Sequence, residues 1–175
     1  NIIKLCEKLK INKLLIASSS EVYSTPSKIP TTEKERILIP DIMNPRFSYS
    51  GGKIISELYG IHSMNKKIKN IIIFRPHNVY GPNMGVDHVI PEIINKILTS
   101  IKNKNYKITI QGNGLQKRSF IFIDDFLNAL YLVIKKGNNE IINIGTNDLI
   151  TIKKLIKNIL KHFPNFKFKI TFDNK

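Results

Sequence analysis

Tyr49 and Lys53 are the two residues in this 175-residue chain whose types and spacing most directly suggest chemistry. They lie four residues apart at the start of a stretch with helical periodicity, so their side chains are expected on one helix face. A phenol is a poor base at neutral pH because its ordinary pKa is about 10. An ammonium group about 4 Å away contributes roughly 4 kcal/mol at an effective dielectric constant of about 20, which would lower that pKa by up to about three pH units before solvent screening. The pair therefore predicts a tyrosine that transfers protons near neutral pH.

Two glycines, Gly51 and Gly52, lie inside the same expected helix. Each costs about 1 kcal/mol of helix stability relative to alanine, so together they weaken one turn by roughly 2 kcal/mol. A residue without a Cβ lets another group come close to the backbone. The glycines therefore favour a flat ligand lying against this helix beside Tyr49.

A second polar group, Ser18 to Glu21, follows directly after the apolar run from Leu14 to Ala17. The run is short enough for a buried strand, so the serine hydroxyls are expected at the carboxyl end of that strand. A hydroxyl there can hydrogen-bond a substrate oxygen whose proton Tyr49 removes, and Glu21 adds a second acid or base. Serines at such a position also satisfy backbone groups of a turn, and both interpretations stay open.

Hydrophobic periodicity predicts the elements that must position these residues. A helix over about residues 2–10 precedes the strand at 14–17, and a helix from 49 to about 64 precedes a strand at 71–74. Residues 22–47 carry four prolines and are expected to form a surface loop. Strand, helix and strand in this order indicate a parallel βαβ unit, whose ligands bind beyond the carboxyl ends of the strands.

The second half of the chain mixes helices and strands. Helices are expected over 88–102, 126–135 and 152–162, and strands over 107–110, 120–123, 141–144 and, by alternation, 166–172. Asp124 and Thr151 are expected as helix N-caps. A domain boundary is expected near residues 82–88.

The composition excludes several classes of protein. With 42% hydrophobic and 23% charged residues, the chain has enough apolar material for a folded core, but no apolar run reaches the roughly 18–20 residues of a membrane span. The net charge of +15 is spread along the chain without a nucleic-acid-binding motif, so neither a membrane nor a nucleic acid is expected as a partner. The single cysteine, Cys6, without clustered ligands predicts no internal disulfide, no metal site and a cytoplasmic location.

Several stretches of the sequence are similar to motifs of one enzyme family. They are IASSSEVY (16–23), NPRFSYSGGK (44–53), RPHNVYGP (75–82), QGNG (111–114), RSFIFIDD (118–125) and NIGT (143–146). Through them, residues 2–162 resemble the extended short-chain dehydrogenase/reductase family, specifically its NAD-dependent nucleotide-sugar epimerases and dehydratases. The resemblance implies an α/β fold, with a partial Rossmann-like parallel sheet and a smaller C-terminal α/β lobe. It assigns residues 1–85 to the C-terminal part of an NAD-binding domain and 86–175 to a nucleotide-sugar-binding lobe, with some return of the chain to the first domain.

The resemblance also implies roles for individual residues. Tyr49 would be the catalytic base, Lys53 would support it and hold the nicotinamide ribose, and Ser19 would be the catalytic hydroxyl residue. Ser18 and Pro76 would also lie beside the cofactor. Substrate-binding positions would be Ser20, Asn78, His88, Val89 and Arg118. An arginine is apt there, because its planar fork of donors matches phosphate oxygens.

The implied ligands are NAD, with NADP left open, and a nucleotide-diphosphate sugar. By the same resemblance, the full-length protein would be a homodimer that pairs through the helix at 2–10 and the helix carrying Tyr49. The implied reaction is epimerisation through transient oxidation of the sugar at C4. Two alternatives stay open: a 4,6-dehydratase in which Glu21 supplies the extra acid or base, and a non-catalytic nucleotide-binding member of the family.

The chain departs from the family pattern in two places. Ser24 stands where glycine is usual, and no Gly-x-x-Gly-x-x-Gly loop occurs ahead of Ser18. We therefore expect the chain to be the C-terminal portion of a longer enzyme, and this portion to be inactive by itself.

Overall fold

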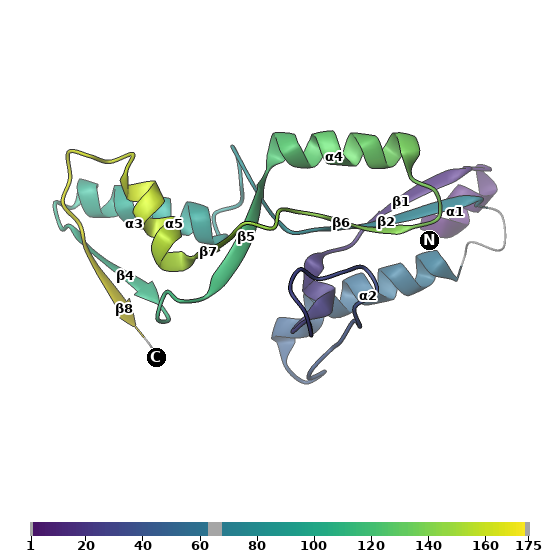
Figure 1. The fold of residues 1–175 in the computed structure, drawn as a ribbon, viewed down its shortest axis with the longest axis horizontal. Helices are drawn as coiled ribbons and strands as arrows, with labels where there is room; N and C mark the ends of the chain where they lie inside the picture. The colour runs from purple at the N-terminus through teal and green to yellow at the C-terminus, as the bar shows by residue number, and fades with distance from the viewer. Residues whose placement is uncertain (1, 63–67, 174–175) are drawn as a thin grey trace. The chain divides into compact units, whose positions relative to one another are not determined.

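The computed structural model describes residues 2–62 and 68–173, which fold as two compact units (Figure 1). The first unit comprises residues 1–79 and 121–146, and the second comprises 80–120 and 147–175. The chain leaves the first unit within β3 (Asn78–Tyr80) and returns to it within β5 (Lys117–Phe122).

A three-stranded parallel sheet forms the centre of the first unit. The elements along the chain are α1 (Ile2–Lys8), β1 (Lys13–Ala17), the 3-10 helices η1 (Ser20–Tyr23) and η2 (Pro45–Phe47), α2 (Ser48–Ile61), β2 (Asn70–Pro76), α4 (Ile123–Lys136) and β6 (Ile141–Ile144). The strand order is β1-β2-β6, and both pairings are parallel. Ala17 lies opposite Phe74 and Pro76 lies opposite Ile144, so the carboxyl ends of the three strands share one edge of the sheet.

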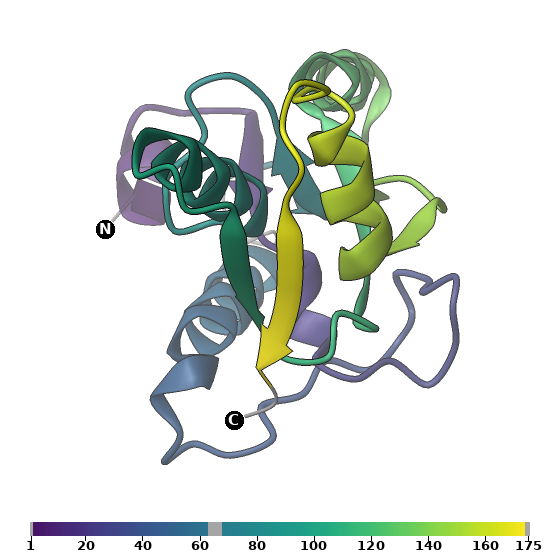
Figure 2. The same cartoon turned by 90° about the vertical axis from the view of Figure 1, so that its left-hand side faces the viewer.

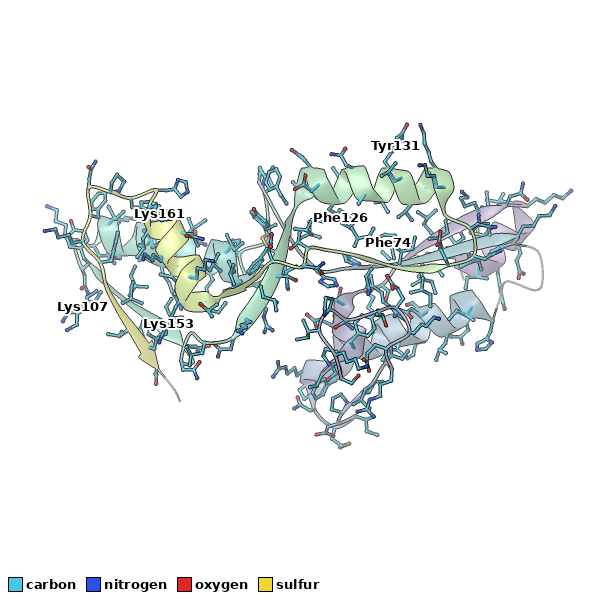
Figure 3. All side chains as sticks on the ribbon, in the orientation of Figure 1. Phe74, Lys107, Phe126, Tyr131, Lys153 and Lys161 are labelled. Atoms are coloured by element: carbon cyan, nitrogen blue, oxygen red, sulfur yellow. The ribbon has the colours of Figure 1, made fainter. Side chains whose placement is uncertain are left out.

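Both faces of this sheet are covered, which explains the unbroken apolar run in β2. Ile71 and Ile73 belong to a core that includes side chains of α1 and α2. Ile72 packs on the opposite face against α4. Figure 3 shows Phe74 on the side of the sheet that faces α4, near Phe126, and the two ring centroids lie 6.3 Å apart. Successive side chains of a strand point to opposite faces, so a strand buried on both must be apolar throughout.

The second unit has its own core, built by two helices and a pair of strands. Its main elements are α3 (Val89–Lys102), β4 (Lys107–Gln111), β7 (Leu149–Thr151), α5 (Ile152–Leu160) and β8 (Lys169–Asp173). β4 and β8 run parallel and side by side (Figure 2), while β5 pairs antiparallel with β7. Ile93 and Ile97 of α3 share a core with Ile108 of β4 and Leu155 of α5.

The expected parallel α/β architecture is confirmed, and the differences lie at element boundaries. The N-cap predicted at Asp124 is wrong, because α4 already begins at Ile123 and its N-cap is Phe122. Asp124 instead lies in the first helical turn, where a carboxylate interacts favourably with the helix dipole. Thr151 is confirmed as an N-cap, since its side chain accepts a hydrogen bond from the backbone N–H of Lys154.

Two other expectations need adjustment. The strand at 14–17 is half-buried rather than buried, since β1 is an edge strand of the sheet as far as the structure describes it. The helix expected to reach about residue 64 is observed to Ile61, and residues 63 and 64 lie outside the described part of the chain. No described helix is long and apolar enough to cross a membrane.

Candidate active site

Tyr49 and Lys53 lie together on the first turns of α2. The side chain of Tyr49 is 54% exposed, and the Lys53 ammonium lies 5.6 Å from the centroid of the Tyr49 ring. Lys53 Nζ also donates a hydrogen bond to the backbone carbonyl of Ala17, 2.8 Å away. The lysine therefore attaches the Tyr49 helix to the carboxyl end of β1.

The serines that follow β1 differ in their surroundings. Ser18 is 2% exposed, and its hydroxyl donates to the carboxylate of Glu57, while its backbone N–H donates to Phe74 O at 2.9 Å. Ser19 is the N-cap of η1, and its Oγ accepts a hydrogen bond of 3.2 Å from the backbone N–H of Glu21. Ser19 therefore satisfies a backbone group of the turn, whereas the Ser18 hydroxyl bonds a side chain of α2. Because Ser19 Oγ is the acceptor in its bond, its hydroxyl proton is not used there. Ser20 begins η1.

Three of the predicted groups converge at the carboxyl edge of the first unit's sheet. Ser18 continues β1, Pro76 ends β2, and Lys53 connects α2 to the residue before Ser18. Glu21 is exposed in the first turn of η1, and Asn78 is exposed at the start of β3. An edge formed by the carboxyl ends of parallel strands is where open α/β sheets bind ligands.

A buried charged pair that the sequence patterns did not predict lies at this edge. Glu57 is 1% exposed and Arg75 is 3% exposed. Arg75 donates to the Glu57 carboxylate from Nε at 2.8 Å and from Nη2 at 2.5 Å. A signal existed, because Glu57 falls three residues after Ile54 and four before Ile61, on the apolar face of the helix. A carboxylate placed there requires a buried partner.

The buried environment changes the proton affinity of two groups at this edge. Burial by itself would lower the pKa of Arg75, but hydrogen bonds to Glu57 and Tyr23 and the charge of Glu57 raise that pKa above its ordinary value. Burial lowers the pKa of His77. Arg75 therefore stays charged, and His77 favours its neutral form.

The two helix glycines have different surroundings. A Cβ built on Gly51 would lie 3.5 Å from Ile39 Cδ1, which is an ordinary packing contact. A Cβ built on Gly52 would have no described heavy atom within 4 Å. Packing inside the described chain thus accounts for neither glycine, and the surface of α2 is open at Gly52.

The remaining predicted residues belong to the second unit. His88 is the N-cap of α3, and Val89 is the first residue of that helix and packs against the unit's core. Arg118 is an exposed residue of β5 and lies opposite Ile150 of β7.

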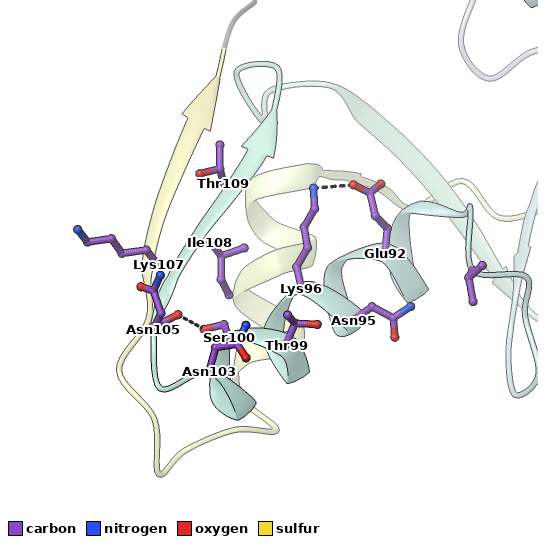
Figure 4. A pocket seen from close by; sticks show the side chains of 11 residues that line it. Glu92, Asn95, Lys96, Thr99, Ser100, Asn103, Asn105, Lys107, Ile108 and Thr109 are labelled. Carbon is purple, nitrogen blue, oxygen red and sulfur yellow. Dashed lines mark hydrogen bonds and ion pairs between the residues drawn. The ribbon is translucent and has the colours of Figure 1, made fainter.

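A groove also lies in the second unit, beside α3 and β4 (Figure 4). Two of the side chains that line it form an ion pair, with Lys96 Nζ 2.6 Å from Glu92 Oε1. None of the predicted site residues lines it. Among the described residues, no three His, Cys, Asp or Glu side chains are grouped as metal ligands would be.

Comparison with known proteins identifies relatives over nearly the whole chain. The chain is 30% identical to the dTDP-D-glucose 4,6-dehydratase of Dictyostelium discoideum over 91% of its length. It superposes on the UDP-N-acetylglucosamine 4-epimerase of Methanobrevibacter ruminantium with 26% identity and a TM-score of 0.82, and on the UDP-glucuronic acid 4-epimerase of Bacillus cereus, solved with NAD, with 25% identity and a TM-score of 0.78. Each structural match covers 99% of the chain.

The chain is shorter than these relatives. It spans 37% of the length of the Dictyostelium enzyme, 54% of the Methanobrevibacter enzyme and 53% of the Bacillus enzyme. The relatives include both epimerases and 4,6-dehydratases of nucleotide sugars. The model of the NAD dependent epimerase/dehydratase family matches residues 1–145, which is most of the chain. The chain therefore belongs to the NAD dependent epimerase/dehydratase family.

Proposed function

We propose that the whole protein is an NAD-dependent nucleotide-sugar epimerase that transiently oxidises the sugar at C4, with Tyr49 as the base. One observation carries the proposal: Lys53 joins the helix of the half-exposed Tyr49 to the end of β1, next to Ser18 and Ser19. A proton acceptor, a cation and a hydroxyl are thereby gathered at the ligand-binding edge of a parallel sheet.

The residues of this edge fit the nicotinamide half of NAD. Gly52 leaves the surface of α2 open to a flat group, Pro76 offers an apolar surface at the end of β2, and Lys53 is a donor for ribose hydroxyls. Ser18 is proposed to lie beside the cofactor because it directly follows β1, although its hydroxyl already donates a hydrogen bond to Glu57. When bound, NAD supplies a hydride acceptor for the sugar carbon.

The chain's own residues manage the proton. Tyr49 takes the proton of the C4 hydroxyl as the C4 hydride departs, and the Ser19 hydroxyl donates a hydrogen bond to the same oxygen. The Lys53 ammonium attracts the negative charge on the phenol oxygen. With a bound NAD supplying oxidation and re-reduction at C4, Tyr49 would return its proton to the C4 oxygen, and re-reduction from the opposite face of the 4-keto sugar would give the C4 epimer without net oxidation.

The nucleotide part of the substrate is assigned to other residues. Ser20, Asn78, His88, Val89 and Arg118 are the proposed substrate-binding residues, with Arg118 as a donor to the diphosphate. Residues 1–85 are proposed as the C-terminal part of the NAD-binding domain and 86–175 as the substrate lobe, with some return of the chain to the first domain, since residues 121–146 belong to the first unit. It also retains the cytoplasmic location expected from the single cysteine.

The whole protein is proposed to be a homodimer. The apolar side chains of α1, of the turn after it and of α2 that support this are exposed, namely Ile2, Leu5, Leu9, Ile55, Leu58 and Tyr59. Two helices from each of two subunits could bury these side chains together in a bundle.

A second candidate is a 4,6-dehydratase, favoured by the exposed carboxylate of Glu21 and by the Dictyostelium relative. Elimination of water from the 4-keto sugar needs an additional acid and base, which Glu21 would supply. A nucleotide-binding protein without turnover is the third candidate.

To test the proposal, the whole protein is incubated with UDP-, GDP- and dTDP-sugars, and the products are identified by NMR. An inverted C4 centre is expected, whereas a 4-keto-6-deoxy product would refute the epimerase in favour of the dehydratase, and binding without any product would refute both. Tyr49→Phe should lower kcat by about 10²–10⁴-fold, the range for losing a general base. A Tyr49→Phe enzyme with unchanged kcat would show that Tyr49 is not the base.

A further inference from the structure

A single carboxylate, that of Glu57, is shared by two segments of the site edge. It accepts a hydrogen bond from the Ser18 hydroxyl, and it accepts two more from Nε and Nη2 of Arg75, which together form a bidentate pair. Charge-assisted bonds of this kind fix direction as well as distance, because the planar guanidinium matches the carboxylate plane. Glu57 thus holds the end of β1 and the end of β2 to α2.

The remaining Arg75 donor holds another part of the chain. Nη1 donates to the hydroxyl of Tyr23 at 2.7 Å and to the backbone carbonyl of Glu33 at 3.3 Å. The Tyr23 hydroxyl in turn donates to Asn143 Oδ1 at 2.7 Å. The backbone N–H of Asn143 also donates to Glu33 Oε1 at 2.9 Å. One guanidinium bond, to Glu33 O, and the bonds of Asn143 to Glu33 and Thr31 therefore tie the 24–47 segment to the sheet edge.

The attachment of α2 to the end of β1 affects the proposed catalytic residues directly. Lys53 and Glu57 lie one helical turn apart, and they contact the successive residues Ala17 and Ser18. Two attachments at adjacent positions fix how α2 is rotated and shifted relative to β1. The position of Tyr49 relative to Ser19 follows from that placement.

Stability alone gives a weak reason for such a pair. Replacing a buried ion pair with apolar side chains of similar size is often neutral or stabilising, whereas removing one partner costs much more. We infer that Glu57 and Arg75 are positioning residues, which set the placement of Tyr49 and Lys53 against Ser18 and Ser19, and that Arg75 helps to hold the 24–47 segment at the sheet edge. The inference rests on the function proposed above.

The test compares single and paired substitutions in the whole protein. Arg75→Met and Glu57→Leu should each lower the melting temperature, because each leaves a buried group without its partner. The Glu57→Leu/Arg75→Met double variant should melt near the wild-type temperature. Its kcat should nevertheless stay about 100-fold low, as expected for a misplacement of about 1 Å, with KM changed much less. A double variant that regains both the melting temperature and kcat would overturn the inference.

Arg75→Lys provides an independent variant in case the double variant does not fold. Lysine keeps the charge but cannot form the bidentate pair, so kcat should fall while the protein remains folded. Trypsin cleavage after Lys34 or Arg36, both exposed, should become roughly tenfold faster, as expected when one charge-assisted bond no longer holds the segment. Wild-type kcat and wild-type cleavage in Arg75→Lys would contradict the inference.

Two controls separate this inference from the proposed function. Glu92→Gln breaks the surface ion pair with Lys96 in the second unit and should leave kcat and cleavage unchanged. Tyr49→Phe is measured in the same assay. If Tyr49→Phe remains active, the proposed function fails; if it is inactive while the stable double variant has normal kcat, only the positioning role fails.

Discussion

Substitution of Gly145 by alanine tests how tightly the end of β6 is packed against the site edge. A Cβ at this position would lie 2.5 Å from His77 Cγ, 2.7 Å from Nδ1 and 2.9 Å from Cβ. Rotating the imidazole cannot relieve the overlap, because the His77 Cβ is one of the atoms overlapped. The backbone cannot shift freely either, because His77 N–H donates to Ile144 O at 2.9 Å.

The expected cost follows from this geometry. Gly145 is not among the glycines with positive φ, so the penalty of a side chain there is steric. Overpacking of this kind costs about 1–3 kcal/mol. One kcal/mol shifts the melting temperature by about 2–4 °C for 150–250 residues and by less for a longer chain, so the melting temperature of the whole protein should fall by at most about 12 °C. Because His77 lies between Pro76 and Asn78, its displacement should also weaken ligand binding at this edge.

The assay is thermal unfolding of the whole protein, followed by circular dichroism. Gly52→Ala is the matched control, because the added methyl group meets no described atom within 4 Å and the exposed helix should gain up to about 1 kcal/mol. A Gly145→Ala protein that melts at or above the wild-type temperature would refute the steric argument. A fall of equal size in both variants would refute it as well.

Two further predictions concern stability. Lys13→Met should lower the free energy of unfolding by about 0.5–1.5 kcal/mol in denaturant titrations, because Lys13 Nζ donates to Ile134 O, 2.8 Å away in the last turns of α4. An unchanged free energy of unfolding would show that this hydrogen bond makes no net contribution to stability. Because burial lowers the pKa of His77, the unfolded chain binds a proton at this residue more readily than the folded chain does. The free energy of unfolding should therefore have its full value above about pH 6.5 and decrease as the pH falls from there toward the folded-state pKa. His77→Asn should remove this part of the pH dependence, and an identical melting profile of wild type and variant between pH 7 and 5 would contradict the assignment.

Much of the fold could be predicted because its signals are local. The apolar run from Ile71 to Phe74 predicts a strand buried on both faces, and α1 and α2 on one side and α4 on the other supply that burial. Thr151 was identifiable as a cap because the N–H group it accepts lies only three residues away. Asp124 was misassigned because β5 runs directly into α4, so the helix begins before the residue that is best suited to cap it.

The candidate site divides in the same way. Short-range spacing was enough to predict that Tyr49 and Lys53 share a helix face and that Ser18 to Glu21 follow a strand. Packing of the strands and helices brings Lys53 to Ala17, and it joins the buried Glu57, Arg75 and Tyr23 to the half-buried Asn143 in one network. Its members come from distant parts of the chain, 120 residues apart for Tyr23 and Asn143. Burial makes each of these polar groups require a partner, and which partner is available is settled only when the strands and helices pack.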